Sequence, residues 1–304
     1  MNKSYSDFII EQQVLQEKLI TFGGKAYPKF GQVVILAGGA GSGKGFTLKT
    51  LLGIEGKVFD VDEIKKAVQN SVKAKAMVKK DLGVDVSTLN LKDPENVRIL
   101  HGILAQTKLL KGGQNALFAD LATLQGKSDR LPNLIFDVTL KDADKLSSIH
   151  SDVTAIGYKK EDIHLVWVIN DIAMAQDQNA TRDRVVPEDI LLKTHVGASK
   201  TVLDLIQDSS NLRKYMDGDV WFSFNKFKVD SMLAKSSDIK PKDAESSGVL
   251  PSRKVGQGSY VTDTIIIKVK AKGKSTNGKG DISKRLLRKI KEYIPNSSEW
   301  VGKK

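Results

Sequence analysis

A short segment limits the architecture of this chain more than any other part of its sequence. Residues 32–37 form a brief apolar run rich in β-branched side chains, which is typical of a strand buried on both faces. Residues 38–44, called the glycine loop below, follow directly with the sequence GGAGSGK and match the pattern G-x-x-x-x-G-K. A run of helical character begins at about Lys44. A strand that passes through such a loop into a helix predicts an α/β fold.

The glycine loop has the chemistry of a phosphate site. Glycines let successive backbone N–H groups turn toward an anion without obstruction by a Cβ atom, and the start of the helix adds a partial positive charge. Lys44 would place a full charge on the β- and γ-phosphates of a nucleotide. The alternatives are a glycine-rich turn with a surface lysine and a dinucleotide-binding fingerprint, of which the second leaves Lys44 unexplained. We predict that ATP or GTP contacts this loop and the residues after it: Gly38, Gly39, Ala40, Gly41, Ser42, Gly43, Lys44, Gly45, Phe46 and Thr47.

The residue after Lys44 departs from the usual pattern. Most such loops carry Ser or Thr there to hold Mg²⁺, whereas this chain has Gly45 and then Phe46 before Thr47. We expect Thr47 and Asp137 to be the metal ligands. Water and other carboxylates are the alternative to Thr47.

Short strands and helical segments alternate along the rest of the first 230 residues. Strands are predicted at 57–61, 134–138, 163–169 and 220–224, with helical segments between them. This alternation indicates a mainly parallel sheet with helices on both faces. The carboxyl edge of an open parallel sheet is where ligands bind, so polar residues at these strand ends are candidates for a site.

Three segments at that edge carry candidate catalytic groups. Asp62 follows the second strand and is the candidate general base, with a helix N-cap as the alternative. Asp137 ends the third strand and could orient a metal-bound water or a substrate hydroxyl, with loop capping as the alternative. Arg182 and Arg184 lie in a charged loop that suits a lid over a triphosphate, with a solvated loop as the alternative.

The positive charge of the chain is concentrated in its last quarter. The whole chain has 48 Lys and Arg against 36 Asp and Glu, a net charge of +12, and residues 231–304 supply +10 of it. We predict a domain over residues 1–230 and a basic extension over 231–304 with flexible linkers. The extension is expected to hold one strand at 261–271 and one basic amphipathic helix at 281–294.

Composition excludes several classes of protein. The chain has no cysteine, so it has no disulfide framework, thiolate zinc site, iron–sulfur cluster or cysteine nucleophile. Its four histidines show no metal-ligand spacing. No apolar run approaches the roughly 20 residues that span a membrane, and the first ten residues lack the apolar stretch of a signal peptide. We expect a cytoplasmic protein without a membrane span.

The motifs together resemble the zeta-toxin-like family of P-loop kinases. The aspartate pair in Asp60-Val61-Asp62-Glu63-Ile64-Lys65, the segment Asp137-Val138-Thr139, and Arg184 shortly before Pro187 are similar to the motifs of that family. The resemblance covers about residues 33–206. It implies a three-layer P-loop kinase fold, Asp62 as the catalytic base, Arg184 as a lid arginine, and Asp137 and Thr139 as substrate-binding residues. The family has a second lid arginine that precedes the one matched by Arg184, and we take Arg182 in its place.

Two classes of function follow from the sequence. The first is a kinase that uses ATP or GTP with Mg²⁺ to phosphorylate a hydroxyl of a small molecule; the resemblance implies a nucleotide sugar for some family members. Lys44, Arg184 and Arg182 would stabilise the transferring phosphoryl group. The second is a nucleic-acid-binding factor or nucleic-acid end kinase that uses residues 231–304, with a solvated basic tail as the simpler reading of that charge. Nucleotide binding without transfer is a third possibility.

Overall fold

The fold is described from a computed structural model of the chain. The described residues are 20–24, 28–107, 109–124, 130–207, 209–225, 233–235, 253–254, 259–261, 264–274 and 284–294. Within them, no helix combines the length and the apolar character needed to cross a membrane.

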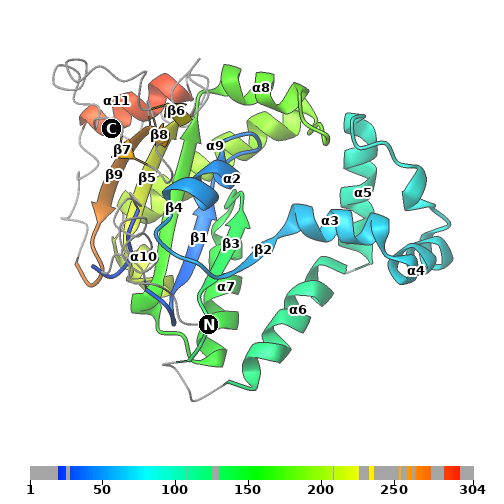
Figure 1. The fold of residues 1–304 in the computed structure, drawn as a ribbon, viewed down its shortest axis with the longest axis horizontal. Coiled ribbons are helices and arrows are strands. Elements are labelled where there is room, and N and C mark those ends of the chain that lie inside the picture. Colours follow the sequence, from blue (N-terminus) through cyan, green and yellow to red (C-terminus); the bar gives the residue numbers. More distant parts are fainter. Residues whose placement is uncertain are drawn as a thin grey trace.

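A six-stranded sheet forms the centre of the molecule, in the order β2-β3-β1-β4-β5-β9 (Figure 1). The first five strands in this order are parallel, and β9 pairs antiparallel with β5. The predicted α/β fold with a mainly parallel sheet is therefore confirmed. The strands are β1 (Val33–Ala37), β2 (Lys57–Asp60), β3 (Leu134–Val138), β4 (Ile163–Asn170), β5 (Val220–Asn225) and β9 (Thr264–Lys270).

Alternate side chains of the strands face two separate apolar clusters, which makes the fold three-layered. In β1, Val33, Ile35 and Ala37 face a cluster that includes side chains of α7, α9, α10 and α11. Val34 and Leu36 face the opposite cluster, which includes residues near 20–22 and 51–54. All eight residues of β4 are buried, as its continuous apolar sequence predicts for a central strand. The helices over both faces are α2 (Lys44–Phe46), π-helix η1 (Thr47–Leu51), α7 (Ala143–Ile156), α8 (Ile172–Ala180), α9 (Glu188–Gln207), α10 (Ser209–Tyr215) and α11 (Lys284–Tyr293).

Four further helices lie between β2 and β3 in the chain, on the β2 side of the sheet in Figure 1. The helical segment that follows β2 is divided into two helices at Ser71, because this residue adopts an extended backbone and its hydroxyl accepts the N–H of Ala74. A small apolar cluster of its own, which includes Val78, Leu100 and Leu104, holds this part together. The four helices are α3 (Val61–Asn70), α4 (Val72–Leu82), α5 (Pro94–Gln106) and α6 (Leu109–Ala122).

Two elements of the predicted extension belong to the main sheet and its core. Strand β9 completes the sheet next to β5, and Ile290, Tyr293 and Ile294 of the α11 region are buried in the larger apolar cluster. The expected strand and amphipathic helix are thus both present. The division of the chain at residue 230 stays a prediction. A separate small sheet has the order β6-β8-β7, with β6 (Leu233–Lys235), β7 (Arg253–Lys254) and β8 (Ser259–Val261).

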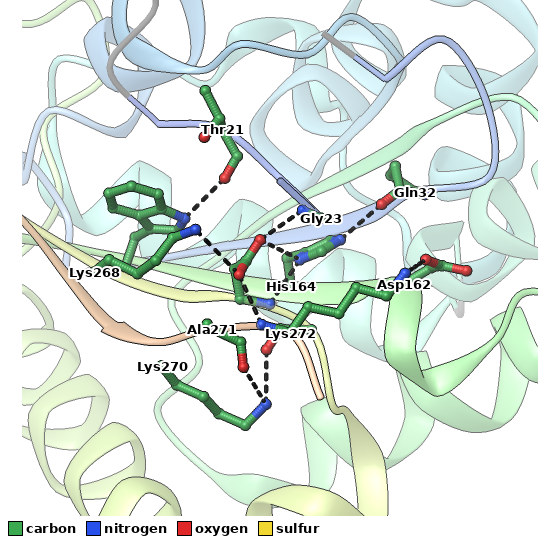
Figure 2. A network of polar contacts seen from close by, with 12 residues as sticks. Thr21, Gly23, Gln32, Asp162, His164, Lys268, Lys270, Ala271 and Lys272 are labelled. Carbon is green, nitrogen blue, oxygen red and sulfur yellow. Dashed lines mark hydrogen bonds and ion pairs between the residues drawn. The ribbon is translucent and has the colours of Figure 1, made fainter. Parts of the chain in front are cut away.

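A polar network joins β9 to the amino ends of β4 and β5 (Figure 2). Asp219, which is 1% exposed, accepts the N–H groups of Gly23 at 2.7 Å and Lys272 at 2.9 Å, and Lys268 lies 3.3 Å from it. Nζ of the buried Lys270 lies 2.8 Å from a carboxylate oxygen of Asp217. These contacts hold β9 against the amino ends of β4 and β5. The glycine loop lies at the other edge of the sheet, after the carboxyl end of β1.

His164, which is fully buried, belongs to this network as a neutral imidazole (Figure 2). Its Nδ1 accepts the N–H of Asp219 at 2.8 Å, so Nε2 carries the proton and donates to Oε1 of Gln32 at 2.9 Å. Burial lowers the pKa of His164 from its ordinary value of 6.5 to about 4.

Replacing the buried Asp219 should destabilise the fold strongly. In Asp219→Ala two backbone N–H groups and Lys268 lose their acceptor inside the protein, and we expect a loss of about 3–5 kcal/mol in the free energy of unfolding, measured in urea. Asp162→Ala is the matched control, because its ion pair with Lys272 is partly exposed and should contribute less than about 1 kcal/mol. Equal losses in the two variants would contradict the proposed importance of Asp219.

His164 should make the fold sensitive to acid. The unfolded chain binds a proton on this residue below pH 6.5, whereas the folded chain does so only near pH 4, so stability falls as the pH drops through this window. The contribution of His164 to the loss is about 2 kcal/mol at pH 5. Urea unfolding at pH 7 and pH 5 should show a shallower pH dependence in His164→Asn than in the unchanged protein. Parallel curves would refute this assignment.

Candidate functional site

A cavity of about 920 Å³ lies at the carboxyl ends of the central parallel strands. Its lining comes from the glycine loop, the starts of α3 and α7, helix α5, and the segment between α8 and α9. We call it the loop cavity. Its position is the one expected for a ligand in an open α/β sheet. The predicted site residues that line it are Ala40, Gly41, Ser42, Gly43, Lys44, Gly45, Asp62, Asp137, Thr139, Arg182 and Arg184.

Lys44 lies over the glycine loop and faces a carboxylate. Its Nζ donates to the carbonyl oxygens of Gly38 at 2.9 Å and Gly39 at 3.3 Å, and it lies 3.6 Å from Oδ1 of Asp137. The loop turns sharply before Lys44 because Gly41 and Gly43 take positive φ angles of 73° and 90°, which L side chains rarely adopt. Lys44 and the loop therefore lie side by side in the lining of the cavity.

Asp62 lies between two cations in the lining of the cavity. Arg184 donates to Oδ2 of Asp62, and Nζ of the buried Lys65 lies 3.5 Å from Oδ1. The arginine comes from a position 122 residues away in the sequence. Among the described residues, the second guanidinium nitrogen of Arg184 is buried without a hydrogen-bond partner.

The alternative role of Asp62 as a helix cap belongs instead to Asp60. The N–H of Asp62 donates to Oδ1 of Asp60 at 2.7 Å, so Asp60 satisfies the first turn of α3. The carboxylate of Asp62 is then directed at Arg184 and Lys65.

The two carboxylates of the cavity have opposite pKa shifts. Burial raises the pKa of Asp62, but the charges of Arg184, Lys65, Lys44 and Arg182 outweigh it and hold the pKa below its ordinary value. Burial raises the pKa of Asp137 to about 6, and the nearby Lys44 offsets only part of that effect. Asp62 is thus ionised at neutral pH, while the charge of Asp137 depends on what lies beside it.

Four of the predicted nucleotide contacts lie outside the lining of the cavity. Gly38 and Gly39 present their carbonyl oxygens to Lys44 rather than a surface to the cavity. Phe46 packs against an apolar cluster of the sheet. Thr47 is fully buried, and among the described residues its hydroxyl has no hydrogen-bond partner. The helix that begins at Lys44 changes to a π-helix at Thr47, whose side chain lies outside the lining of the cavity.

The protein oxygens that line the loop cavity suit a Mg²⁺ ion that is held mainly by a nucleotide and water. Within the described part of the chain, no group of three or more His, Asp or Glu side chains could hold a metal ion. Mg²⁺ in nucleotide sites commonly keeps several waters and uses only one or two protein oxygens beside the phosphates. Asp137 lines the cavity, and so does Ser42, whose buried hydroxyl has no hydrogen-bond partner.

Sequence reasoning missed several residues around the site. Arg98 and His101 of α5 line the cavity, as does Lys145 of α7. No local pattern marks them, because they come from helices whose orientation depends on packing. Asn170 and Asn225, which bond the glycine loop, are the last residues of β4 and β5, so their place at strand ends was the available signal.

Comparison with known proteins gives no sequence match and several distant structural ones. No family model and no curated protein matches the sequence. A solved chain of the PezAT chromosomal toxin–antitoxin system of Streptococcus pneumoniae matches with a TM-score of 0.38 and 13% identity, covering 73% of this chain and 77% of that one.

Two further solved structures are similar at the same distant level. The AvrRxo1-ORF1:-ORF2 structure with ATP matches with a TM-score of 0.37 and 10% identity, covering 90% of this chain and 75% of that one. Deoxyadenosine kinase from M. mycoides with bound dATP matches with a TM-score of 0.26 and 16% identity, covering 66% and 92%. At identities this low, the chemistry of this chain has to be inferred from its own residues.

Two glycines of the loop should respond oppositely to alanine. A Cβ on Gly43, whose φ is 90°, would lie 2.4 Å from Nδ2 of Asn225, so Gly43→Ala should destabilise the fold by about 1–3 kcal/mol. A Cβ on the helical Gly45 meets nothing within 4 Å, so Gly45→Ala should stabilise by about 0.5–1 kcal/mol. Urea unfolding of both variants measures the contrast, and changes of the same sign would contradict the loop geometry.

Proposed function

We propose that this chain is a kinase that transfers the γ-phosphoryl group of ATP or GTP to a hydroxyl of a small acceptor. The observation that carries the proposal is that Lys44, Asp62 and Arg184 line one cavity although they come from three separate parts of the chain. Phosphoryl transfer requires a phosphate-binding cation, a group that receives the acceptor proton, and charge to stabilise the moving phosphoryl group.

The glycine loop and Lys44 are the donor half of the proposed site. Backbone N–H groups of the loop would bind the β- and γ-phosphates, and Lys44 would exchange its carbonyl partners and Asp137 for phosphate oxygens. Ser42 and Asp137 are the protein oxygens that would hold Mg²⁺, in place of the predicted Thr47. The metal, when bound, neutralises developing charge on the phosphates.

Asp62 and Arg184 are the acceptor half. Asp62, kept ionised by its neighbours, would orient the acceptor hydroxyl and receive its proton. The new bond joins that oxygen to the γ-phosphorus. The bond between the γ-phosphorus and the oxygen that bridges the β- and γ-phosphates breaks, and the nucleoside diphosphate leaves. Arg184 has one guanidinium nitrogen on Asp62 and another without a hydrogen-bond partner, which suits it to bind a phosphoryl oxygen without leaving Asp62. Arg182, exposed at the rim, would add charge from the same segment.

The class of acceptor is part of the proposal. A cavity of about 920 Å³ has room for a nucleotide and a small second molecule, a nucleotide sugar among the candidates. Thr139 lies on its lining beside Asp137 and would contact that molecule. Nucleic-acid binding through residues 231–304 would have to use cations other than Lys268, Lys270 and Lys272, since each of these three lies against an aspartate of the body.

Two substitutions should separate nucleotide binding from transfer. Lys44→Ala should weaken ATP binding and abolish transfer, because the phosphates lose their cation. Asp62→Asn should keep ATP affinity within a few-fold and lower transfer by about 10²–10⁴, because the group that receives the proton is removed. Labelled ATP with UDP-sugars, nucleosides and 5′-hydroxyl oligonucleotides in parallel provides the measurement.

Asp177→Asn, on an exposed position of α8, is the control and should leave both properties unchanged. Full transfer in both Lys44→Ala and Asp62→Asn would refute the assignment. ATP binding without transfer to any acceptor would favour the nucleotide-binding alternative.

A further inference from the structure

The glycine loop is hydrogen-bonded by four buried side chains that have no role in the proposed chemistry. They are Asn170 at the end of β4, Asn225 at the end of β5, and the adjacent Thr194 and His195 of α9. Their exposed fractions are 0%, 4%, 9% and 2%, respectively. We call them the supporting side chains. Their partners are three consecutive residues of the loop.

Three of them donate to the loop's carbonyl oxygens. Nε2 of His195 lies 2.8 Å from the oxygen of Ala40, and Nδ2 of Asn170 lies 2.9 Å from the oxygen of Gly41. Nδ2 of Asn225 lies 2.5 Å from the oxygen of Ser42. Burial lowers the pKa of His195 to about 4, so the ring is neutral at pH 7 and its Nε2–H is the donor to Ala40.

These contacts determine where the loop's N–H groups point. In a planar trans peptide the carbonyl of one residue and the N–H of the next point in opposite directions. Because the oxygens of Ala40, Gly41 and Ser42 are directed at the supporting side chains, the N–H groups of Gly41, Ser42 and Gly43 point away from them. The N–H of Ser42 donates to the carbonyl of Gly39 at 3.2 Å, which leaves those of Gly41 and Gly43 for an anion.

Thr194 has the opposite effect on the preceding peptide. Its hydroxyl donates to the carbonyl of Leu191 at 2.7 Å and accepts the N–H of Ala40 at 3.1 Å. The N–H of Ala40 is therefore directed at α9 rather than at the phosphate position. Close packing preserves this arrangement, since a Cβ on Gly39 would lie 2.3 Å from the His195 ring.

We propose that His195, Asn170 and Asn225 are positioning residues for the phosphate site, and that they select the N–H groups of Gly41 and Gly43, and not that of Ala40, as the loop's phosphate donors. The inference rests on the proposed nucleotide binding. It adds that helix α9, which begins four residues after Arg184, holds one side of the loop through Thr194 and His195. A loop fixed in this orientation before the ligand arrives loses less conformational freedom on binding.

The first test measures the amide groups directly in the unchanged protein. Backbone ¹⁵N–¹H spectra are recorded with and without Mg²⁺–ATP. The resonances of Gly41 and Gly43 should shift strongly and gain protection from hydrogen exchange, while that of Ala40 should stay nearly unchanged. A large shift at Ala40 with little change at Gly41 and Gly43 would overturn the proposal.

The second test separates positioning from simple stability. His195→Leu removes the donor to Ala40, whereas the terminal amide of His195→Gln reaches about as far as Nε2 and restores it. We expect the Kd for ATP to rise about tenfold in His195→Leu and to stay within about threefold of the unchanged protein in His195→Gln. Thermal unfolding without nucleotide is measured on both, so that affinity is compared only between folded samples.

The outcomes distinguish this inference from the proposed function. If ATP does not bind the unchanged protein, the proposed function itself fails. If ATP binds and the folded His195→Leu variant has the same Kd as His195→Gln, the positioning role fails and the proposed function stands. If the Kd for ATP rises in His195→Leu but not in His195→Gln, the positioning role is supported. A purely structural role would lower the unfolding temperature of the variants without this difference in Kd.

Discussion

The direction of the peptide groups in the glycine loop is the constraint on which the site depends. A loop that offers N–H groups to an anion must turn its carbonyl oxygens outward, and buried carbonyls need donors. The ends of β4 and β5 and one turn of α9 supply them through Asn170, Asn225 and His195. The order of the sheet therefore has a direct chemical consequence, because β4 lies beside β1 and β5 beside β4. Lys44 completes the set by donating to the first two carbonyls of the loop.

The loop cavity also shows how similar side chains acquire different properties from their surroundings. Asp62 and Asp137 are both largely buried, and burial alone would raise the pKa of each. Asp62 contacts Arg184 and Lys65, so it remains a carboxylate. For Asp137, burial and the charges of Asp60 and Asp62 outweigh the nearby Lys44, so its pKa is raised to about 6. A cation entering the site would favour the ionised form of Asp137, which fits the separate role proposed for it near the metal and the phosphates.

The basic charge of residues 231–304 has a partly internal explanation. Lys268, Lys270 and Lys272 pair with Asp219, Asp217 and Asp162, so strand β9 supplies the cations that three aspartates of the body require. Asp219 and Lys270 are almost fully buried, and such groups are stable only when they are paired and hydrogen-bonded. An excess of lysine in one part of a sequence therefore does not by itself indicate a nucleic-acid surface.

The sequence by itself determined the five parallel strands, the place of the glycine loop between β1 and α2, and the candidates Lys44, Asp62, Asp137 and Arg184. These follow from short-range signals, namely apolar runs, glycine spacing and acidic residues at strand ends. The break at Ser71 and the burial of Thr47 depended on contacts that local propensity does not contain. Only the tertiary structure decided that Arg184 meets Asp62 across 122 residues and that α9 holds the loop through Thr194 and His195. Both contacts have the same physical reason, because each forms when the packing of helices against the sheet brings distant segments together. The spacing of residues along the chain does not specify that geometry.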